Sequence, residues 1–245
     1  MKINVAWVPN TLTMGNLLFG FFSIIYSSMG TPENSKPYFV AGLFILGAAI
    51  LDGLDGKVAR ILHVSSPLGA ELDSLADCVT FGVAPGYLAY KAYLSGMTLP
   101  MFVMPVDMGI FIAAVFPVCA AYRLARFNVI HDPDSFSGLP SPVAGIIVAL
   151  VPVCFTMQSI FQSGIPRIIF SVCFLVVALL MVSTVKYAKP QETITVTKIK
   201  IAFFLVFVAI LVFWFKQWAV FIIIALYILS GIVSFVIQLI QDHRY

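Results

Sequence analysis

Long apolar runs separated by short polar breaks extend along the whole chain. A membrane-crossing helix needs about 20 apolar residues, and we read eight runs of suitable length, near residues 11–28, 38–62, 69–94, 103–127, 141–161, 166–186, 200–215 and 218–241. The breaks between them carry turn residues, as in Gly30-Thr31-Pro32-Glu33-Asn34. The pattern predicts an all-α, polytopic membrane protein with about eight transmembrane helices, in a single domain that comprises residues 1–245.

The composition agrees with this prediction. Hydrophobic residues make up 61% of the chain and charged residues only 10%, whereas a soluble domain has about 25% charged residues. A water-soluble fold of this length could not bury so much apolar surface. The net charge of +3 gives no support to nucleic-acid binding. The four cysteines lie in apolar runs without metal-ligand spacing, so we interpret them as buried packing residues.

The distribution of lysine and arginine predicts the orientation of the chain, because cytoplasmic loops carry an excess of these residues. With the N-terminus in the cytoplasm, the outer side would hold only Lys36, Lys91, Arg167 and Lys216. The cytoplasmic side would hold Lys2, Lys57, Arg60, Arg123, Arg126, Lys186, Lys189, Lys198, Lys200 and Arg244. We therefore expect both termini to be cytoplasmic.

Four aspartates interrupt the second and third apolar runs, where a charge costs roughly 2.5–3.5 kcal/mol on insertion scales. Asp52 and Asp55 are three residues apart, and Asp73 and Asp77 are four apart, so each pair lies on one face of its helix. The two helices are consecutive and antiparallel, which lets the pairs face each other at the cytoplasmic side. Four converging carboxylates suit one or two hard cations such as Mg²⁺ or Mn²⁺.

Small residues accompany the first aspartate pair. Gly53, Gly56 and Ala59 leave the helix face bare, so that an anionic ligand could approach the backbone. Arg60, one turn beyond Gly56, could bind two phosphate oxygens through its guanidinium group. Two alternatives remain open: the glycines could serve close helix packing, and Arg60 could be a cytoplasmic anchor.

The full motif is Asp-x-x-Asp-Gly-x-x-Ala-Arg, then eight residues, Gly, three residues, Asp, three residues and Asp. It resembles the signature of the CDP-alcohol phosphotransferases, with every fixed position present: Asp52, Asp55, Gly56, Ala59, Arg60, Gly69, Asp73 and Asp77. The resemblance implies one transmembrane domain of this family, a homodimer, and two divalent cations held by the four aspartates. It also implies that Asp77 acts as general base. Gly56, Ala59 and Arg60 would hold the CDP moiety.

Further segments resemble the members of this family that transfer a phosphatidyl group to serine. These segments cover residues 9–16, 81–86, 122–128 and 136–142. The resemblance implies CDP-diacylglycerol as donor, L-serine as acceptor and CMP as product. We expect nucleotide contacts from Asn10, Thr13 and Asn16, with helix capping as the alternative. For Arg123, Arg126 and Asn128 we expect contacts to the lipid phosphate or the serine carboxylate, with cytoplasmic anchoring as the alternative for the two arginines.

Other functions stay open at this point. The acceptor could be glycerol 3-phosphate or inositol phosphate, although few basic residues are available for an extra phosphate. The donor could be an archaeal ether-lipid analogue of CDP-diacylglycerol. A cation transporter would also place carboxylates in the membrane, but it would spread them along a path and often contain repeated halves. Here five of the eleven acidic residues lie within 52–77, and we find no repeat.

Overall fold

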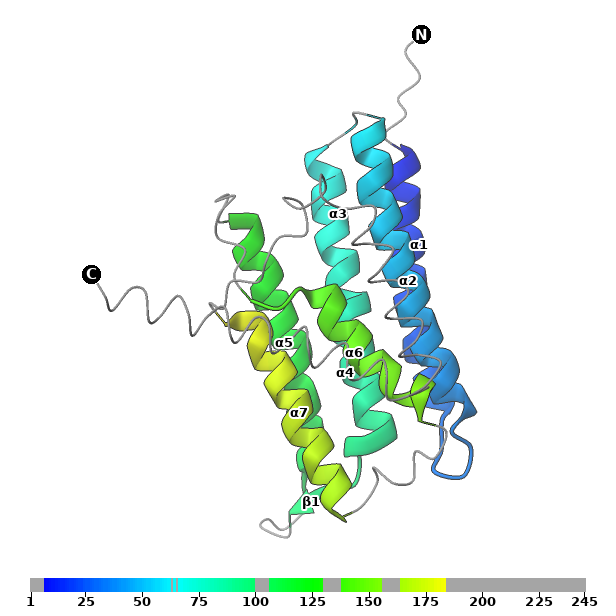
Figure 1. The fold of residues 1–245 in the computed structure, drawn as a ribbon, viewed down its shortest axis with the longest axis vertical. Helices are drawn as coiled ribbons and strands as arrows, with labels where there is room; N and C mark the ends of the chain where they lie inside the picture. Colours follow the sequence, from blue (N-terminus) through cyan, green and yellow to red (C-terminus); the bar gives the residue numbers. More distant parts are fainter. Residues whose placement is uncertain are drawn as a thin grey trace, which may run out of the picture. The chain divides into compact units, whose positions relative to one another are not determined.

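A computed structural model describes residues 7–62, 64, 66–99, 106–129, 138–155 and 164–183 (Figure 1). All helices of this part lie in one compact unit, Met1–Val129 with Pro140–Val182. A second unit, Ile130–Leu139 with Ser183–Tyr245, falls almost wholly outside the described residues. The apolar runs predicted to span the membrane at 200–215 and 218–241 are also outside them. The single-domain organisation therefore stays a prediction.

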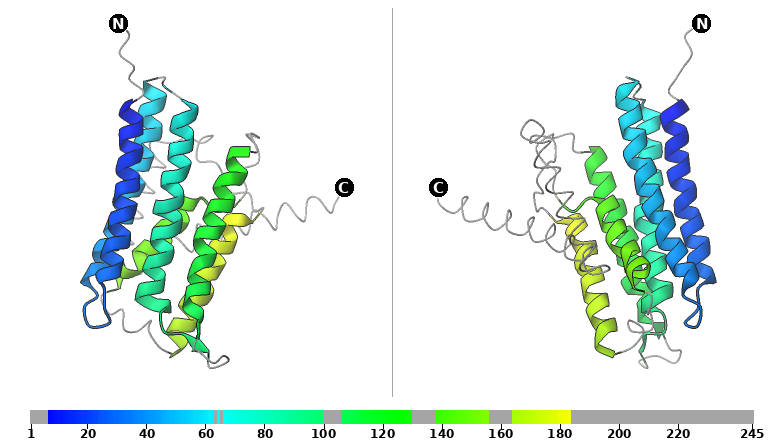
Figure 2. Two further views of the ribbon diagram at one scale, coloured as in Figure 1. Left: turned by 180° about the vertical axis from the view of Figure 1, so that it is seen from behind. Right: turned by 45° about the vertical axis from the view of Figure 1, so that its right-hand side comes forward.

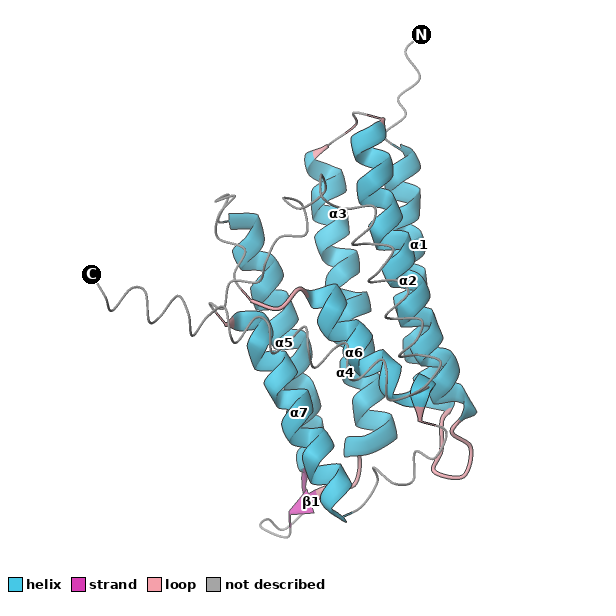
Figure 3. Ribbon diagram, viewed as in Figure 1, coloured by secondary structure: helices cyan, strands magenta, loops and turns pink. Residues whose placement is uncertain are grey.

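The described part is helical, as the apolar pattern predicts (Figure 3). Its only strands among the described residues are β1 (Thr98–Leu99) and β2 (Val106–Asp107), which form a two-residue antiparallel ladder. The helical elements, in chain order, are α1 (Trp7–Met29), α2 (Lys36–Ile61), α3 (Pro67–Cys78), η1 (Val79–Val83), α4 (Ala84–Ala89), η2 (Tyr90–Leu94), α5 (Met108–Val129), α6 (Ser141–Cys154) and α7 (Gly164–Val182).

Four of these helices, α1, α2, α5 and α7, are long and apolar enough to cross a membrane, and α6 is a shorter apolar helix. The prediction of a polytopic helical membrane protein is thus confirmed in this coarse form. The third predicted run, 69–94, is a continuous succession of α3, η1, α4 and η2, in which η1 and η2 are π-helical. Eight spans and cytoplasmic termini remain predictions.

The polar breaks in the sequence determine where the helices begin. Ser66 is the N-cap of α3, and its hydroxyl accepts a 3.0 Å hydrogen bond from the backbone N–H of Gly69. Pro67 follows in the first turn, where its missing N–H and its fixed φ angle are compatible with a helix. A proline also lies in the first turn of α2 and of α6. These signals place the start of α3 six residues before Asp73.

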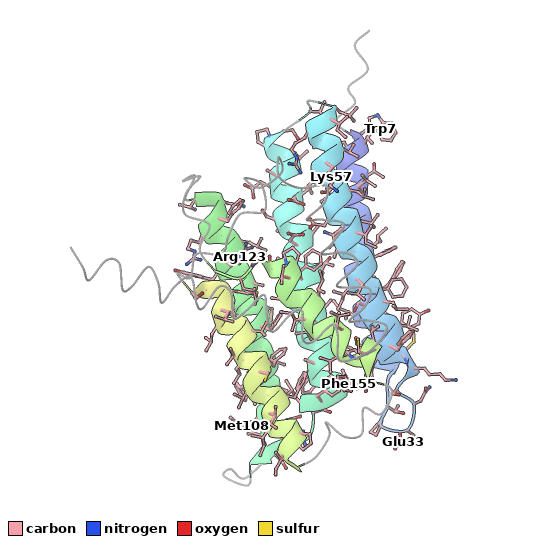
Figure 4. The ribbon with its side chains drawn as sticks, viewed as in Figure 1. Trp7, Glu33, Lys57, Met108, Arg123 and Phe155 are labelled. Carbon is pink, nitrogen blue, oxygen red and sulfur yellow. The ribbon has the colours of Figure 1, made fainter. Side chains whose placement is uncertain are left out.

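Successive helical segments of the described part, taken as α1, α2, α3 to η2, α5, α6 and α7, alternate in direction (Figures 1 and 2). Helix α1 packs along α2, and the chain from α3 to α4 contacts α1, α5 and α6. As a result α1 and α3 begin, and α2 and α5 end, at the same end of the unit. In Figure 4, Trp7 and Lys57 mark this end, whereas Glu33, in the turn between α1 and α2, marks the opposite end. The aspartate motif lies toward the end marked by Lys57.

The opposite end is held together by Asp107, directly before α5. Its carboxylate accepts hydrogen bonds from the backbone N–H groups of Gly96 (2.9 Å), Met97 (3.2 Å) and Gly109 (2.9 Å) and from the hydroxyl of Tyr90 (3.1 Å). Partial burial alone would raise the pKa of this carboxyl, but the four hydrogen bonds outweigh burial and hold the pKa below its usual range. In its ionised form Asp107 therefore joins η2 and the residues directly after it to the start of α5.

Candidate metal and nucleotide site

Helices α2 and α3 bring the four aspartates of the motif together. Asp52, Asp55 and Asp73 each offer a carboxylate oxygen, and these oxygens lie within 4.8 Å of one another. The carboxyl group of Asp77, one turn beyond Asp73 on α3, lies within electrostatic range of the other three. Carboxylates from α2 and α3 thus converge, as the spacing in the sequence predicts, and both helices pack against α1.

This cluster contains no compensating positive side chain from the described residues. Asp55 and Asp77 are buried, with 5% and 8% of their surface exposed, and Asp52 and Asp73 are half-buried. One buried oxygen of Asp73, Oδ1, has no hydrogen-bond partner in the part of the chain that the structure describes. Carboxylates this close repel one another unless a cation or a proton compensates them. An all-oxygen donor set of this kind fits one or two divalent cations such as Mg²⁺ or Mn²⁺.

Helix α1 supplies two neutral donors to these carboxylates. The hydroxyl of Thr13 donates to Asp55 Oδ2 at 2.9 Å, and Nδ2 of Asn16 donates to Asp77 Oδ1 at 3.2 Å. The sequence motif suggested nucleotide contacts for both residues. In the structure both side chains are buried and hydrogen-bond to aspartates. Thr13 also borders the cavity described next.

A cavity of about 200 Å³ opens beside Asp55 and Asp73. Its lining includes seven residues that the sequence analysis selected: Asn10, Thr13, Asp55, Gly56, Ala59, Gly69 and Asp73. It also includes four that the sequence analysis did not select: Pro9, Val64, Ser66 and Ala70. The Ser-Pro start of the helix that carries the second aspartate pair was a signal that could have indicated Ser66.

Gly56 and Gly53 face open space. A Cβ atom added to either residue would meet no described atom within 4 Å, so close helix packing does not explain these two glycines. Gly56 instead lines the cavity, where the absence of a side chain leaves space for a ligand. Arg60 is exposed, and its Nε donates a 3.0 Å hydrogen bond to the carbonyl of Gly56, one turn back on the same helix. Within the described residues its two terminal nitrogens make no hydrogen bond, so they are available to an anionic ligand.

The three residues at the end of α5 have different surroundings. Arg123 is buried and donates from Nη1 to the hydroxyl of Ser141 at 3.1 Å (its position is marked in Figure 4). Arg126 donates from Nη1 to the carbonyl of Val182, at the end of α7, at 3.1 Å. Arg123 thus joins α5 to the start of α6, and Arg126 joins α5 to α7.

Asn128 contacts the helix that carries the second aspartate pair. Its Nδ2 donates a 3.0 Å hydrogen bond to the hydroxyl of Ser74, which lies next to Asp73 in the sequence. Neither Ser74 nor Ser141 is among the site residues predicted from the sequence. The position of Ser74 between two motif aspartates was an available signal, whereas nothing near Ser141 in the sequence indicated a buried arginine as its partner.

Carboxylates from two antiparallel helices converge beside a cavity that small residues line. The protein is thus a helical membrane protein with a candidate metal site made of carboxylates. Comparison with known proteins narrows this class. The family described as CDP-alcohol phosphatidyltransferase matches residues 6–173, more than half of the sequence. The chain therefore belongs to the CDP-alcohol phosphatidyltransferase family, and the resemblance found in the motif is confirmed. Membership in a transferase family does not support the alternative of a cation transporter.

Curated relatives support the same assignment. A Helicobacter pylori protein is 32% identical over 245 residues, covering 98% of this chain and 96% of its own. A Bacillus subtilis protein is 36% identical over 185 residues, covering 74% and 89%. A Methanocaldococcus jannaschii protein is 33% identical over 185 residues, covering 76% and 75%. Each of the three is named CDP-diacylglycerol–serine O-phosphatidyltransferase.

Proposed function

We propose that this phosphatidyltransferase moves the phosphatidyl group of CDP-diacylglycerol to the hydroxyl of L-serine, giving phosphatidylserine and CMP. The observation that carries the proposal is the convergence of Asp52, Asp55, Asp73 and Asp77 beside a cavity walled by Gly56. The names of the relatives support serine as the acceptor and CDP-diacylglycerol as the donor.

The four aspartates would hold two divalent cations, Mg²⁺ or Mn²⁺, between α2 and α3. When bound, such cations supply positive charge that stabilises the diphosphate and the departing phosphate oxygen. Gly56 and Ala59 would let the CDP moiety approach the backbone of α2, because neither side chain fills the cavity. The terminal nitrogens of Arg60 would hydrogen-bond the phosphate oxygens of the nucleotide.

Asp77 would act as the general base. Its carboxylate takes the proton from the serine hydroxyl while the serine oxygen attacks the phosphorus bonded to the lipid. The bond between this phosphorus and the CMP oxygen breaks, and CMP leaves with the electron pair. A positioned base contributes typically about 10²–10⁴-fold to the rate. Burial of Asp77 supports this role, because bulk water is kept from the carboxylate.

We assign the serine side of the site to the end of α5. Arg123 is buried beside Ser141, and its guanidinium group would contact the serine carboxylate or the lipid phosphate. Asn128 reaches Ser74, beside the second aspartate pair, and is placed to hydrogen-bond the same substrate. The bond from Arg126 to Val182 favours a supporting role for Arg126 at the end of α7.

The multi-pass helices place the protein in a membrane. We further propose that the aspartate end faces the cytoplasm, where serine, CMP and divalent cations are dissolved. The excess of lysine and arginine expected on that side supports this orientation. A homodimer is proposed from family resemblance alone.

The test is an assay of CMP release. Purified protein is incubated with CDP-diacylglycerol and Mn²⁺ together with L-serine, glycerol 3-phosphate or inositol phosphate in turn. CMP release that depends on serine supports the proposal, whereas release with another alcohol corrects the acceptor. A chelator should abolish the release, and added Mg²⁺ or Mn²⁺ should restore it. Absence of release with every acceptor, together with ion flux in liposomes, would overturn the proposal.

A further inference from the structure

Two buried hydrogen bonds join α1 to the helix that carries the proposed base. Nδ2 of Asn16 donates to Asp77 Oδ1 at 3.2 Å, and the hydroxyl of Thr80 donates to the backbone carbonyl of Asn16 at 3.1 Å. Asn16 and Thr80 have no exposed surface, and Asp77 has 8%. The arrangement Asp77–Asn16–Thr80 is therefore closed to solvent, and its geometry depends on packing inside the bundle.

The spacing of these residues explains why both contacts form together. Asp77 and Thr80 are three residues apart and present neighbouring side chains to α1, and Asn16 and Gly20 are four apart on the facing side of α1. A Cβ atom on Gly20 would lie 2.5 Å from Thr80 Oγ1 and 2.9 Å from its Cα. Only a glycine at position 20 lets Thr80 approach closely enough to reach the carbonyl of Asn16.

Thr80 also lies in the π-helical segment η1, which begins two residues after Asp77. Segments of this kind are frequent at functional sites. Here the side chain of Thr80 points toward α1 and is fully buried. Thr80 thus gives a second hydrogen bond to α1, three residues after the proposed base.

The chemical effect falls on the orientation of one carboxylate. A neutral amide donor on Oδ1 limits rotation of the Asp77 side chain and directs Oδ2 away from α1. A reacting group must be held within about 0.5 Å of its productive position by packing and by hydrogen bonds from surrounding residues. Because Asn16 has no exposed surface, a direct contact to nucleotide would require α1 to move.

We propose that Asn16 is a positioning residue that orients the carboxylate of Asp77 for proton transfer, and that Thr80 and Gly20 hold Asn16 in register. This inference rests on the proposed role of Asp77 as base. It assigns to Asn16 a function different from nucleotide contact, and it assigns a function to Thr80, which the sequence motif does not include.

The test compares Asn16→Leu, Thr80→Val and Thr80→Ser with wild type. A misplacement of about 1 Å can cost about 10²-fold, so Asn16→Leu should lower kcat by about that factor. The KM for CDP-diacylglycerol, and the binding of CMP measured without turnover, should stay unchanged. Thr80→Val should lower kcat less, and Thr80→Ser, which keeps the hydroxyl, should restore it. Ser23→Ala is the matched control, because Ser23 is also fully buried on α1 but makes no hydrogen bond in the described part.

Several results would overturn the inference. If Asn16→Leu weakens CMP binding and leaves kcat unchanged, Asn16 contacts the nucleotide. If Thr80→Ser is as impaired as Thr80→Val, or if Ser23→Ala loses kcat equally, the residues act through packing alone. Asp77→Asn separates this inference from the proposed function. Full turnover in Asp77→Asn would show that Asp77 is not the general base. If Asp77→Asn is inactive and Asn16→Leu is fully active, Asn16 has no positioning role, and the role of Asp77 as base is retained.

Discussion

The hydroxyl of Thr13 donates a 2.9 Å hydrogen bond to Asp55 Oδ2, so that α1 and α2 are joined at a buried carboxylate. Loss of a hydrogen bond to a charged group costs about 1.5–3 kcal/mol. We therefore expect Thr13→Val, which keeps the shape of the side chain, to lower the Tm of the detergent-solubilised protein. Thr13→Ser keeps the hydroxyl and should retain most of the stability. Equal Tm values for Thr13→Val and wild type would show that this bond does not stabilise the fold.

Gly20→Ala should destabilise the protein by overpacking. The added methyl group would lie 2.5 Å from Thr80 Oγ1 and 2.9 Å from the backbone of the same residue, so α1 and η1 would have to separate. Overpacking of this kind costs typically about 1–3 kcal/mol. Thermal unfolding measures the loss. Gly53→Ala is the matched control, because its added methyl group meets no described atom within 4 Å.

Gly56→Ala should affect ligand binding and leave the fold intact. Its methyl group would also meet no described atom within 4 Å, and it would project beside the cavity that Gly56 lines. Replacing glycine by alanine inside a helix favours the helix by about 1 kcal/mol, so Tm should be unchanged or higher. The KM for CDP-diacylglycerol should rise if the nucleotide occupies this space. An unchanged KM would remove Gly56 from the proposed nucleotide site.

Mn²⁺ should stabilise the protein through the aspartate cluster. A ligand that binds only the folded state at 100 times its Kd adds about 2.7 kcal/mol of stability. We expect Tm to rise with Mn²⁺ concentration in the absence of substrate and to fall on addition of a chelator. In Asp73→Asn, which removes one of the three closest carboxylates, the response should weaken strongly. A normal Mn²⁺ response in Asp73→Asn would place the cation elsewhere.

Asp107 should make stability dependent on pH at the opposite end of the helices. A carboxyl whose pKa is lowered by folding adds stability above its unfolded pKa, about 3.9, and that stability is lost as the pH falls through the lower folded pKa. Asp107→Asn should therefore lower Tm at neutral pH, and its difference from wild type should shrink in acid below about pH 4. Thermal unfolding measured over this pH range provides the check. Glu33→Gln, at an exposed position in the turn between α1 and α2, should change Tm little at any pH.

Much of the described fold follows from the hydrophobic pattern. The apolar runs at 11–28 and 38–62 correspond to α1 and α2, whose ends differ from these ranges by a few residues. The run at 69–94 corresponds to the succession from α3 to η2, but the pattern does not indicate its π-helical segments. A π-helical turn adds one residue per turn without changing which residues are apolar, so hydropathy cannot reveal it.

Only part of the candidate site was predictable from the sequence. The spacing of Asp52, Asp55, Asp73 and Asp77 was sufficient to predict that two helices present carboxylates to each other, and the structure brings them together. The sequence also indicated that the polar residues of α1 contact polar groups and not lipid. It could not identify their partners, because the bond from Asn16 to Asp77 joins residues 61 positions apart through the packing of α1 on α3.

The aspartates and the donors that hold them all come from α1, α2, α3 and η1, whereas Arg123 and Ser141 come from α5 and α6. On the proposed assignment, the residues that hold the cations and CDP and the residues that meet serine or the lipid phosphate are therefore encoded in separate stretches of the gene. Substitutions of Arg123 or Ser141 would then alter substrate selection without replacing any ligand of the cations.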